Sequence, residues 1–136
     1  MQTARIITAL QERYPQVVIR EAIKPYPFAT FPAISSDFGD IELIDEGDTI
    51  TAVYGNFTHC HYDSPDDWTE PKYTDFLLQN LCDDLDKIFD DQIEFWGSHQ
   101  FSGGFRPITP STRKATLFSR AKDITLWSGA KYKRKS

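Results

Sequence analysis

The stretch DIELIDEGDTITAVY, residues 40–54, decides the fold of this chain. Apolar and acidic residues alternate over residues 40–45, and a second alternating run returns over residues 49–54. Between the two runs, Glu46-Gly47-Asp48 provides a short turn that contains a glycine. Two alternating runs around such a turn predict an antiparallel β-hairpin with one buried face.

The segment that follows this hairpin predicts one more strand and a long helix. Residues 56–62 continue in extended chain, with a β-bulge expected at Gly55. Thr74 or Asp75 is suited to begin the helix, which we expect to end near residue 90. Its apolar residues recur at a spacing of three or four, which predicts an amphipathic helix that packs on a sheet. The stripe consists of Leu77, Leu78, Leu81, Leu85, Ile88 and Phe89.

Shorter elements are predicted on both sides of this central unit. Residues 2–13 predict a first helix that ends before Pro15, and residues 17–19 predict a short strand. Three prolines predict an irregular segment over residues 25–34. Near the C-terminus we expect a strand over 91–96, a loop at Ser102-Gly103-Gly104, and a hairpin of residues 115–119 and 124–128 that turns near Lys122-Asp123.

The order of these elements predicts an α+β fold. We expect one domain over residues 1–136, with a mainly antiparallel β-sheet and two helices packed on one face. A length of 136 residues, of which 40% are hydrophobic and 26% charged, fits a single globular domain. The two cysteines allow at most one disulfide, which excludes a disulfide scaffold.

The apolar segments and the N-terminal residues bear on the cellular location of the protein. No apolar run approaches the roughly 20 residues that a membrane span needs. The first residues, MQTAR, lack the apolar stretch of a secretory signal. We therefore expect a cytoplasmic protein that has no membrane partner.

Charge is divided unevenly along the chain. Residues 1–112 hold 19 of the 20 acidic and 7 of the 15 basic residues, a net charge of −12. Residues 113–136 hold 8 basic residues and one acidic residue, a net charge of +7. We expect these basic residues to be solvated or to pair with the acidic body, with a flexible segment over about 129–136. Nucleic acid is disfavoured as a partner, because the acidic body repels phosphates and Tyr132 is the only aromatic residue of 129–136 that could stack on bases.

The run THCHYD, residues 58–63, is the clearest candidate for chemistry. On a strand, His59, His61 and Asp63 point to one face. Two imidazoles and a carboxylate suit zinc or iron, so the run predicts a metal site, to which His99 is a further candidate ligand. The alternative is that both histidines lie on the solvent face and bond to nearby carboxylates. Cys60 points to the opposite face, where we expect a small buried hydrophobe rather than a nucleophile.

This run also resembles the Thr-His-x-His-x-Asp-His motif of β-lactamase-like metallohydrolases. The resemblance covers six residues and implies a metal-dependent hydrolase. However, Ser64 stands in place of the last histidine, and only His99 follows downstream. We therefore set this family aside.

An acidic surface around a tryptophan is the second candidate site. Five carboxylates lie between Asp63 and Asp75, and the predicted long helix adds several more. Trp68 lies among them as a possible aromatic anchor. We expect Trp68, Asp83 and Asp86 to contact a basic protein partner, because such a surface speeds association with basic proteins and repels nucleic acid.

A broader resemblance covers residues 39–105. The sequence resembles a group of small uncharacterised bacterial proteins in the segments GDIE (39–42), GNFTHCH (55–61), IFDD (88–91), IEFW (93–96) and GGF (103–105). This resemblance implies a compact cytoplasmic bacterial protein and no particular activity. In size, acidity and fold class the chain is similar to immunity proteins that neutralise bacterial toxins.

Two functions from different classes follow from these observations. The first is a non-enzymatic protein-interaction module without a cofactor, an immunity-type inhibitor of a toxin. The alternative is a small metal-binding protein or metal-dependent enzyme that uses the His-x-His-x-Asp strand with zinc or iron. The sequence names neither the partner nor the oligomeric state.

Overall fold

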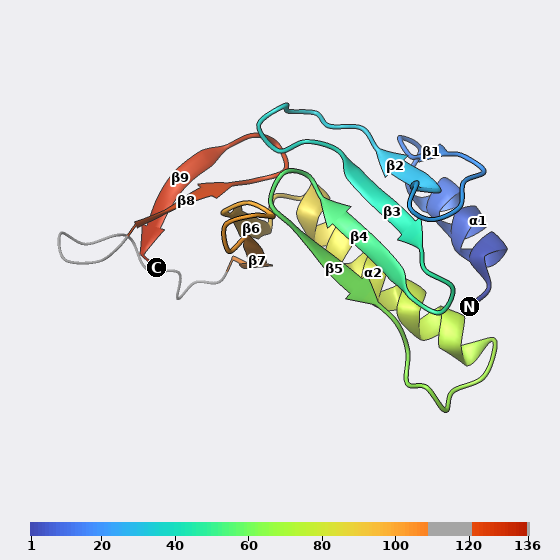
Figure 1. Cartoon of the computed structure of the whole chain (residues 1–136). Coiled ribbons are helices and arrows are strands. Elements are labelled where there is room, and N and C mark those ends of the chain that lie inside the picture. The colour runs from blue at the N-terminus through green and yellow to red at the C-terminus, as the bar shows by residue number, and fades with distance from the viewer. Residues whose placement is uncertain (109–120, 136) are drawn as a thin grey trace.

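The computed structural model of the chain describes residues 1–108 and 121–135. Within these ranges the chain forms two helices and two antiparallel sheets (Figure 1), which confirms the α+β prediction. The strands divide into two sheets rather than the single sheet we expected. The helices are α1 (Thr3–Arg13) and α2 (Lys72–Phe89). The strands are β1 (Val18–Ile19), β2 (Ala29–Phe31), β3 (Ile41–Asp45), β4 (Ile50–Tyr54), β5 (Thr58–Tyr62), β6 (Ile93–Trp96), β7 (Gly104–Pro107), β8 (Ala121–Thr125) and β9 (Lys131–Lys135).

The first sheet follows the order of the chain, β1-β2-β3-β4-β5, with every neighbouring pair antiparallel. The predicted hairpin is its centre, because Leu43 of β3 pairs with Ala52 of β4. The β4–β5 connection is a tight turn rather than the expected bulge. Gly55 is needed there, since its φ is +53° and an added Cβ would lie 2.0 Å from the carbonyl oxygen of Phe38.

Both helices contribute to the core on one face of this sheet, and α2 runs behind β4 and β5 in Figure 1. Alternate residues of β3 and β4 point to this face and are fully buried. The predicted stripe of α2 faces them, with Leu77, Leu81 and Leu85 fully buried. The helix begins two residues before Thr74, which is itself buried and donates a hydrogen bond to Glu70 (2.8 Å).

The second sheet has the order β7-β6-β8-β9. It joins the same core through aromatic rings, since Phe38 packs edge-on against Phe95 of β6 at 4.7 Å and against Trp127 at 5.2 Å. Glu94 of β6 is fully buried and lies 2.7 Å from Arg106 Nε and 2.6 Å from Arg134 Nε. Two guanidinium groups thus compensate one buried carboxylate.

Two strands lie where the sequence predicted irregular chain. Strand β2 lies within the proline-containing segment. It can form there because the prolines flank the strand and do not interrupt it, so that Ala29 and Phe31 bury their side chains. Strand β7 begins at Gly104, where an added Cβ would lie 2.6 Å from the ring of Trp96. A three-residue strand and a strand that opens on glycine show too little alternation to be predicted.

The C-terminal hairpin also differs from the prediction. Strands β8 and β9 pair with residues 126–130 between them, so Lys122 and Asp123 lie inside β8 and do not form the turn. Residues 131–135 form β9 instead of part of a flexible segment. The predicted strand over 115–119 lies outside the described residues.

Candidate functional site

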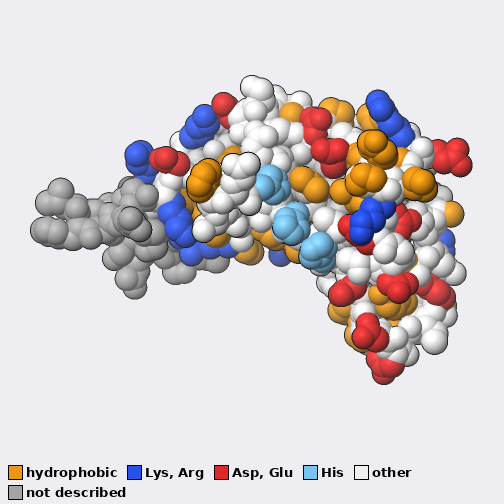
Figure 2. All heavy atoms as spheres, in the orientation of Figure 1, with side chains coloured by type: hydrophobic (Ala, Val, Ile, Leu, Met, Phe, Trp, Pro, Cys, Tyr) orange, Lys and Arg blue, Asp and Glu red, His pale blue; other side chains and the backbone are white. Residues whose placement is uncertain are grey.

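The three histidines of the chain form a row on one surface, which Figure 2 shows in pale blue. His59 and His61 are exposed on β5 and share one face, as predicted, with ring centroids 5.2 Å apart. His99 lies beside them, with its ring 6.3 Å from that of His59 and tilted by only 16°. The loop after β6 thus adds a third imidazole to the two on β5.

His61 is oriented by groups from neighbouring segments. Its Nδ1 lies 2.9 Å from the hydroxyl oxygen of Thr51, the residue directly opposite on β4. The Thr51 hydroxyl donates to Glu46 (3.2 Å), and Lys24 lies 2.6 Å from the other oxygen of that carboxylate. The hydrogen bond from Lys24 holds the pKa of Glu46 below its ordinary value, so Glu46 stays an ionised acceptor near neutral pH.

The predicted three-ligand metal site is not assembled in this structure. Within residues 1–108 and 121–135, no three His, Cys, Asp or Glu side chains form a group that could hold a metal ion. Asp63 is exposed and lies one residue beyond the end of β5. Binding of zinc or iron by His59, His61 and Asp63 therefore stays a prediction.

The two cysteines are free thiols. Cys60 projects from the face of β5 opposite the histidines and packs at the margin of the core, and Cys82 is buried on α2. Burial raises the pKa of both thiols, which disfavours the nucleophilic thiolate.

A hollow of about 470 Å³ lies at the end of the molecule where β5 leads into α2. Figure 2 shows acidic side chains gathered at this end. Carboxylates come from the turn between β3 and β4 and from the loop before α2, and two aromatic rings complete the wall. The lining residues are Met1, Asp48, Asp66, Trp68, Thr69, Glu70 and Tyr73.

The carboxylates of this hollow differ in how they are compensated. Glu70 pairs with the N-terminal amino group of Met1 (3.3 Å) and accepts the hydrogen bond of Thr74. Among the described residues, no cation lies within ion-pair distance of Asp48 or Asp66. The hollow therefore holds negative charge that is free to attract a cation. The sequence indicated Asp66 as part of an acidic surface, but it did not indicate Asp48. The turn between β3 and β4 brings Asp48 into the hollow from 18 residues away.

Trp68 forms a half-exposed aromatic pair next to the hollow. Its ring packs edge-on against Phe76 of α2 at 5.0 Å, and the ammonium nitrogen of Lys72 lies 3.7 Å from its centre. Phe76 itself is 41% exposed. The pair is thus held in place by α2 while it still presents apolar surface to solvent.

The two predicted partner residues on α2 have different surroundings. Asp83 is exposed and accepts a hydrogen bond from Gln79 (2.8 Å). Asp86 instead joins the two helices, because it pairs with Arg13 and accepts a hydrogen bond from the Tyr14 hydroxyl (2.6 Å). Burial raises the pKa of Asp86, but the hydrogen bonds from Arg13 and Tyr14 outweigh this effect and lower it overall.

The helix α1 also neutralises Asp75, which pairs with Arg5. The outer face of α2 is consequently less acidic than its sequence indicates. The sequence did not reveal this, since the two arginines precede their partners by 70 and 73 residues.

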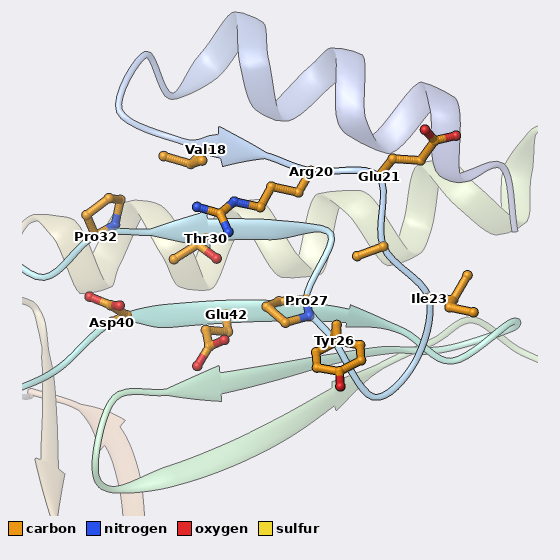
Figure 3. A pocket seen from close by; sticks show the side chains of 11 residues that line it. Val18, Arg20, Glu21, Ile23, Tyr26, Pro27, Thr30, Pro32, Asp40 and Glu42 are labelled. Atoms are coloured by element: carbon orange, nitrogen blue, oxygen red, sulfur yellow. The ribbon is translucent and has the colours of Figure 1, made fainter.

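A second and larger hollow, of about 790 Å³, lies on the open face of the first sheet (Figure 3). The segment between β1 and β2 contributes Ile23 and Tyr26 to the lining of this hollow, and their side chains are 83% and 69% exposed. Arg20 and Glu42 bring opposite charges to its lining. Sequence reasoning missed this hollow, and the only signal for it was the pair of apolar residues among the prolines of that segment.

Comparisons of the chain with models of protein families, with curated proteins and with solved structures found no match. No helix in the described parts of the chain has the length and apolar character that a membrane span requires.

Proposed function

We propose that this protein is a non-enzymatic interaction module that binds a basic protein segment at its acidic hollow. An immunity-type inhibitor of a toxin is the class of protein that this behaviour fits. The proposal is supported most by one observation: the carboxylates of Asp48 and Asp66 share a hollow, and neither has a cation partner within the described residues.

The chemistry of the hollow suits the side chain of a lysine or an arginine. A cation that enters it gains two carboxylates and the ring of Tyr73, whose face attracts positive charge. A volume of about 470 Å³ is sufficient for such a side chain. Trp68 adds apolar contact area, and tryptophan is enriched among the residues that dominate binding energy at interfaces.

Asp83 extends this surface along α2. It lies seven residues after Phe76, which on a helix places it on nearly the same face about 10 Å away. An exposed carboxylate at that distance steers a basic partner toward the hollow. Asp86 does not serve in this way, because its carboxylate is already engaged by Arg13 and Tyr14.

The test begins with capture of the partner from the native host, with the protein as bait. Association of the purified pair is then followed by stopped-flow fluorescence. We expect Trp68→Ala to weaken binding by about 30-fold, as at interface hot spots. The double variant Asp48→Asn/Asp66→Asn should slow association several-fold at low salt, with a smaller effect at high salt.

The matched control is Asp90→Asn, which removes one exposed carboxylate at the far end of α2. It should leave the association rate within about twofold of wild type, because its charge is remote from the hollow. Equal rates for Asp90→Asn and for the double variant would show that net charge, not the hollow, attracts the partner. A partner without a basic surface would also contradict the proposal.

A further inference from the structure

We propose that His59 and His61 form a two-imidazole site for a divalent transition-metal ion, and that Thr51 and Glu46 hold His61 in its ligating form. This site lies on β5 and is independent of the acidic hollow. It differs from the set predicted from the sequence, because neither Asp63 nor His99 takes part.

The strand geometry brings the two imidazoles together. Positions 59 and 61 are separated by one residue, so both side chains leave the same face of β5. Their ring centroids are 5.2 Å apart and the rings are inclined by 72°. Two nitrogens that share a metal ion at about 2.0–2.1 Å lie roughly 3 Å apart, a separation that rings at this spacing can adopt.

The hydrogen bonds around His61 determine which of its nitrogens carries the proton. The single hydroxyl proton of Thr51 is donated to Glu46 (3.2 Å), so toward His61 the Thr51 oxygen can only accept. The Nδ1 atom of His61, 2.9 Å from that oxygen, must therefore be the donor. In the neutral ring the lone pair then resides on Nε2, which is free to bind a metal.

This arrangement is the one by which proteins orient metal-bound histidines. The nitrogen that does not bind the metal donates to an acceptor that leads to a carboxylate. Here the chain runs from His61 through Thr51 to Glu46, and Lys24 anchors the far end at 2.6 Å. Thr51 is buried, with 7% exposure, so its hydroxyl is fixed in place. A surface histidine with no ligand to bind needs no such hydrogen-bond chain to orient its ring.

His99 lies next to this site but is oriented for another contact. Its Nε2 lies 3.1 Å from the carbonyl oxygen of Gly55, which can only accept, so Nε2 carries the proton. Its ring is nearly parallel to that of His59 at 6.3 Å. The nitrogen lone pairs of an imidazole lie in the ring plane, so two stacked rings do not direct them at one ion.

Two neutral imidazoles select among metal ions. Nitrogen ligands suit Cu²⁺, Ni²⁺ and Zn²⁺, and affinity for such a site rises toward Cu²⁺. The oxygen-preferring ions Mg²⁺ and Ca²⁺ gain little there. Water completes the coordination, since both histidines are exposed.

The experiment titrates the purified 136-residue chain with Cu²⁺ and, separately, with Zn²⁺ by isothermal calorimetry. We expect one ion per chain. His59→Asn and His61→Asn should each lower the affinity at least tenfold, and the double variant should abolish binding. In the electron paramagnetic resonance spectrum of the Cu²⁺ complex, the nitrogen couplings should correspond to two imidazoles, and to one in either single variant.

Thr51 is tested as a positioning residue with two variants. Thr51→Val removes the hydroxyl and should lower the affinity about 10- to 100-fold, the usual effect of losing an orienting partner. Thr51→Ser keeps the hydroxyl and should restore most of the affinity. A loss of equal size in both variants would overturn the role of the hydroxyl.

The matched controls are His99→Asn and Asp63→Asn, which should both bind Cu²⁺ within about twofold of wild type. Unchanged binding in the His59→Asn/His61→Asn double variant would overturn the proposed site. Loss of binding in either control equal to that of His61→Asn would overturn the assignment of two imidazoles. Because the probe is the metal alone, either result leaves the proposed binding of a basic partner untouched.

Discussion

Replacement of Asp86 by asparagine is expected to destabilise the fold, although this carboxylate of α2 is partly exposed to solvent. Asp86 connects α2 to the end of α1 through Arg13 and the hydroxyl of Tyr14 (2.6 Å). The ion pair with Arg13 is nearly half exposed on both sides, and such pairs contribute about 0–1 kcal/mol. The hydrogen bond from Tyr14 is stronger, because its acceptor is charged and the Tyr14 ring is buried, and it contributes about 1.5–2 kcal/mol. We expect Asp86→Asn to lower the free energy of unfolding by about 2 kcal/mol.

The assay is urea unfolding at pH 7, followed by the fluorescence of the three tryptophans. Tyr14→Phe should account for most of the loss, since it keeps the ring contacts with Phe31 and Phe89 and removes only the hydroxyl. In the double variant Tyr14→Phe/Asp86→Asn, the two losses should be far from additive. Asp83→Asn is the matched control and should change stability by less than about 0.5 kcal/mol.

Acid should weaken the same contact. The pKa of folded Asp86 lies below its ordinary value, so its contribution is complete above the unfolded pKa of about 3.9. The contribution is lost as the pH falls from there through the lower folded pKa, where the carboxyl becomes protonated. The stability difference between wild type and Asp86→Asn should therefore shrink below about pH 4. Equal destabilisation by Asp83→Asn and Asp86→Asn, or a difference that persists at low pH, would refute this reasoning.

Three more predictions concern the core and the turns. Leu81→Ala should lower the free energy of unfolding in urea by about 2–5 kcal/mol, because removal of this fully buried side chain leaves a cavity between α2 and the first sheet. A loss near zero would contradict that packing. Glu94→Gln should lower the free energy of unfolding by about 3–5 kcal/mol, since it leaves two guanidinium groups beside a neutral amide. An unchanged melting temperature would contradict the proposed compensation of charge at Glu94. Gly55→Ala should destabilise the fold far more than Gly47→Ala. Both glycines have positive φ, but only at Gly55 would the new Cβ collide with the backbone. Equal losses of stability would exclude the collision as the cause.

Local patterns in the sequence predicted the central part of this fold. The alternation over residues 40–54 and the three-and-four spacing from Leu77 to Phe89 set side chains on one face of a strand or helix, and burial of that face follows from the hydrophobic effect. The same period of two placed His59 and His61 together on the surface and Cys60 opposite to them. These features depend only on residues close together in the chain.

Contacts between distant segments decided the rest. No local pattern predicts that Arg13 neutralises Asp86, that Asp48 joins Asp66 in one hollow, or that Thr51 and Glu46 select the tautomer of His61. Strands β2 and β7 are too short to show a period, and they form because neighbouring strands offer unpaired backbone groups. The division into two sheets has the same origin, since it depends on which strand edges meet in the folded core.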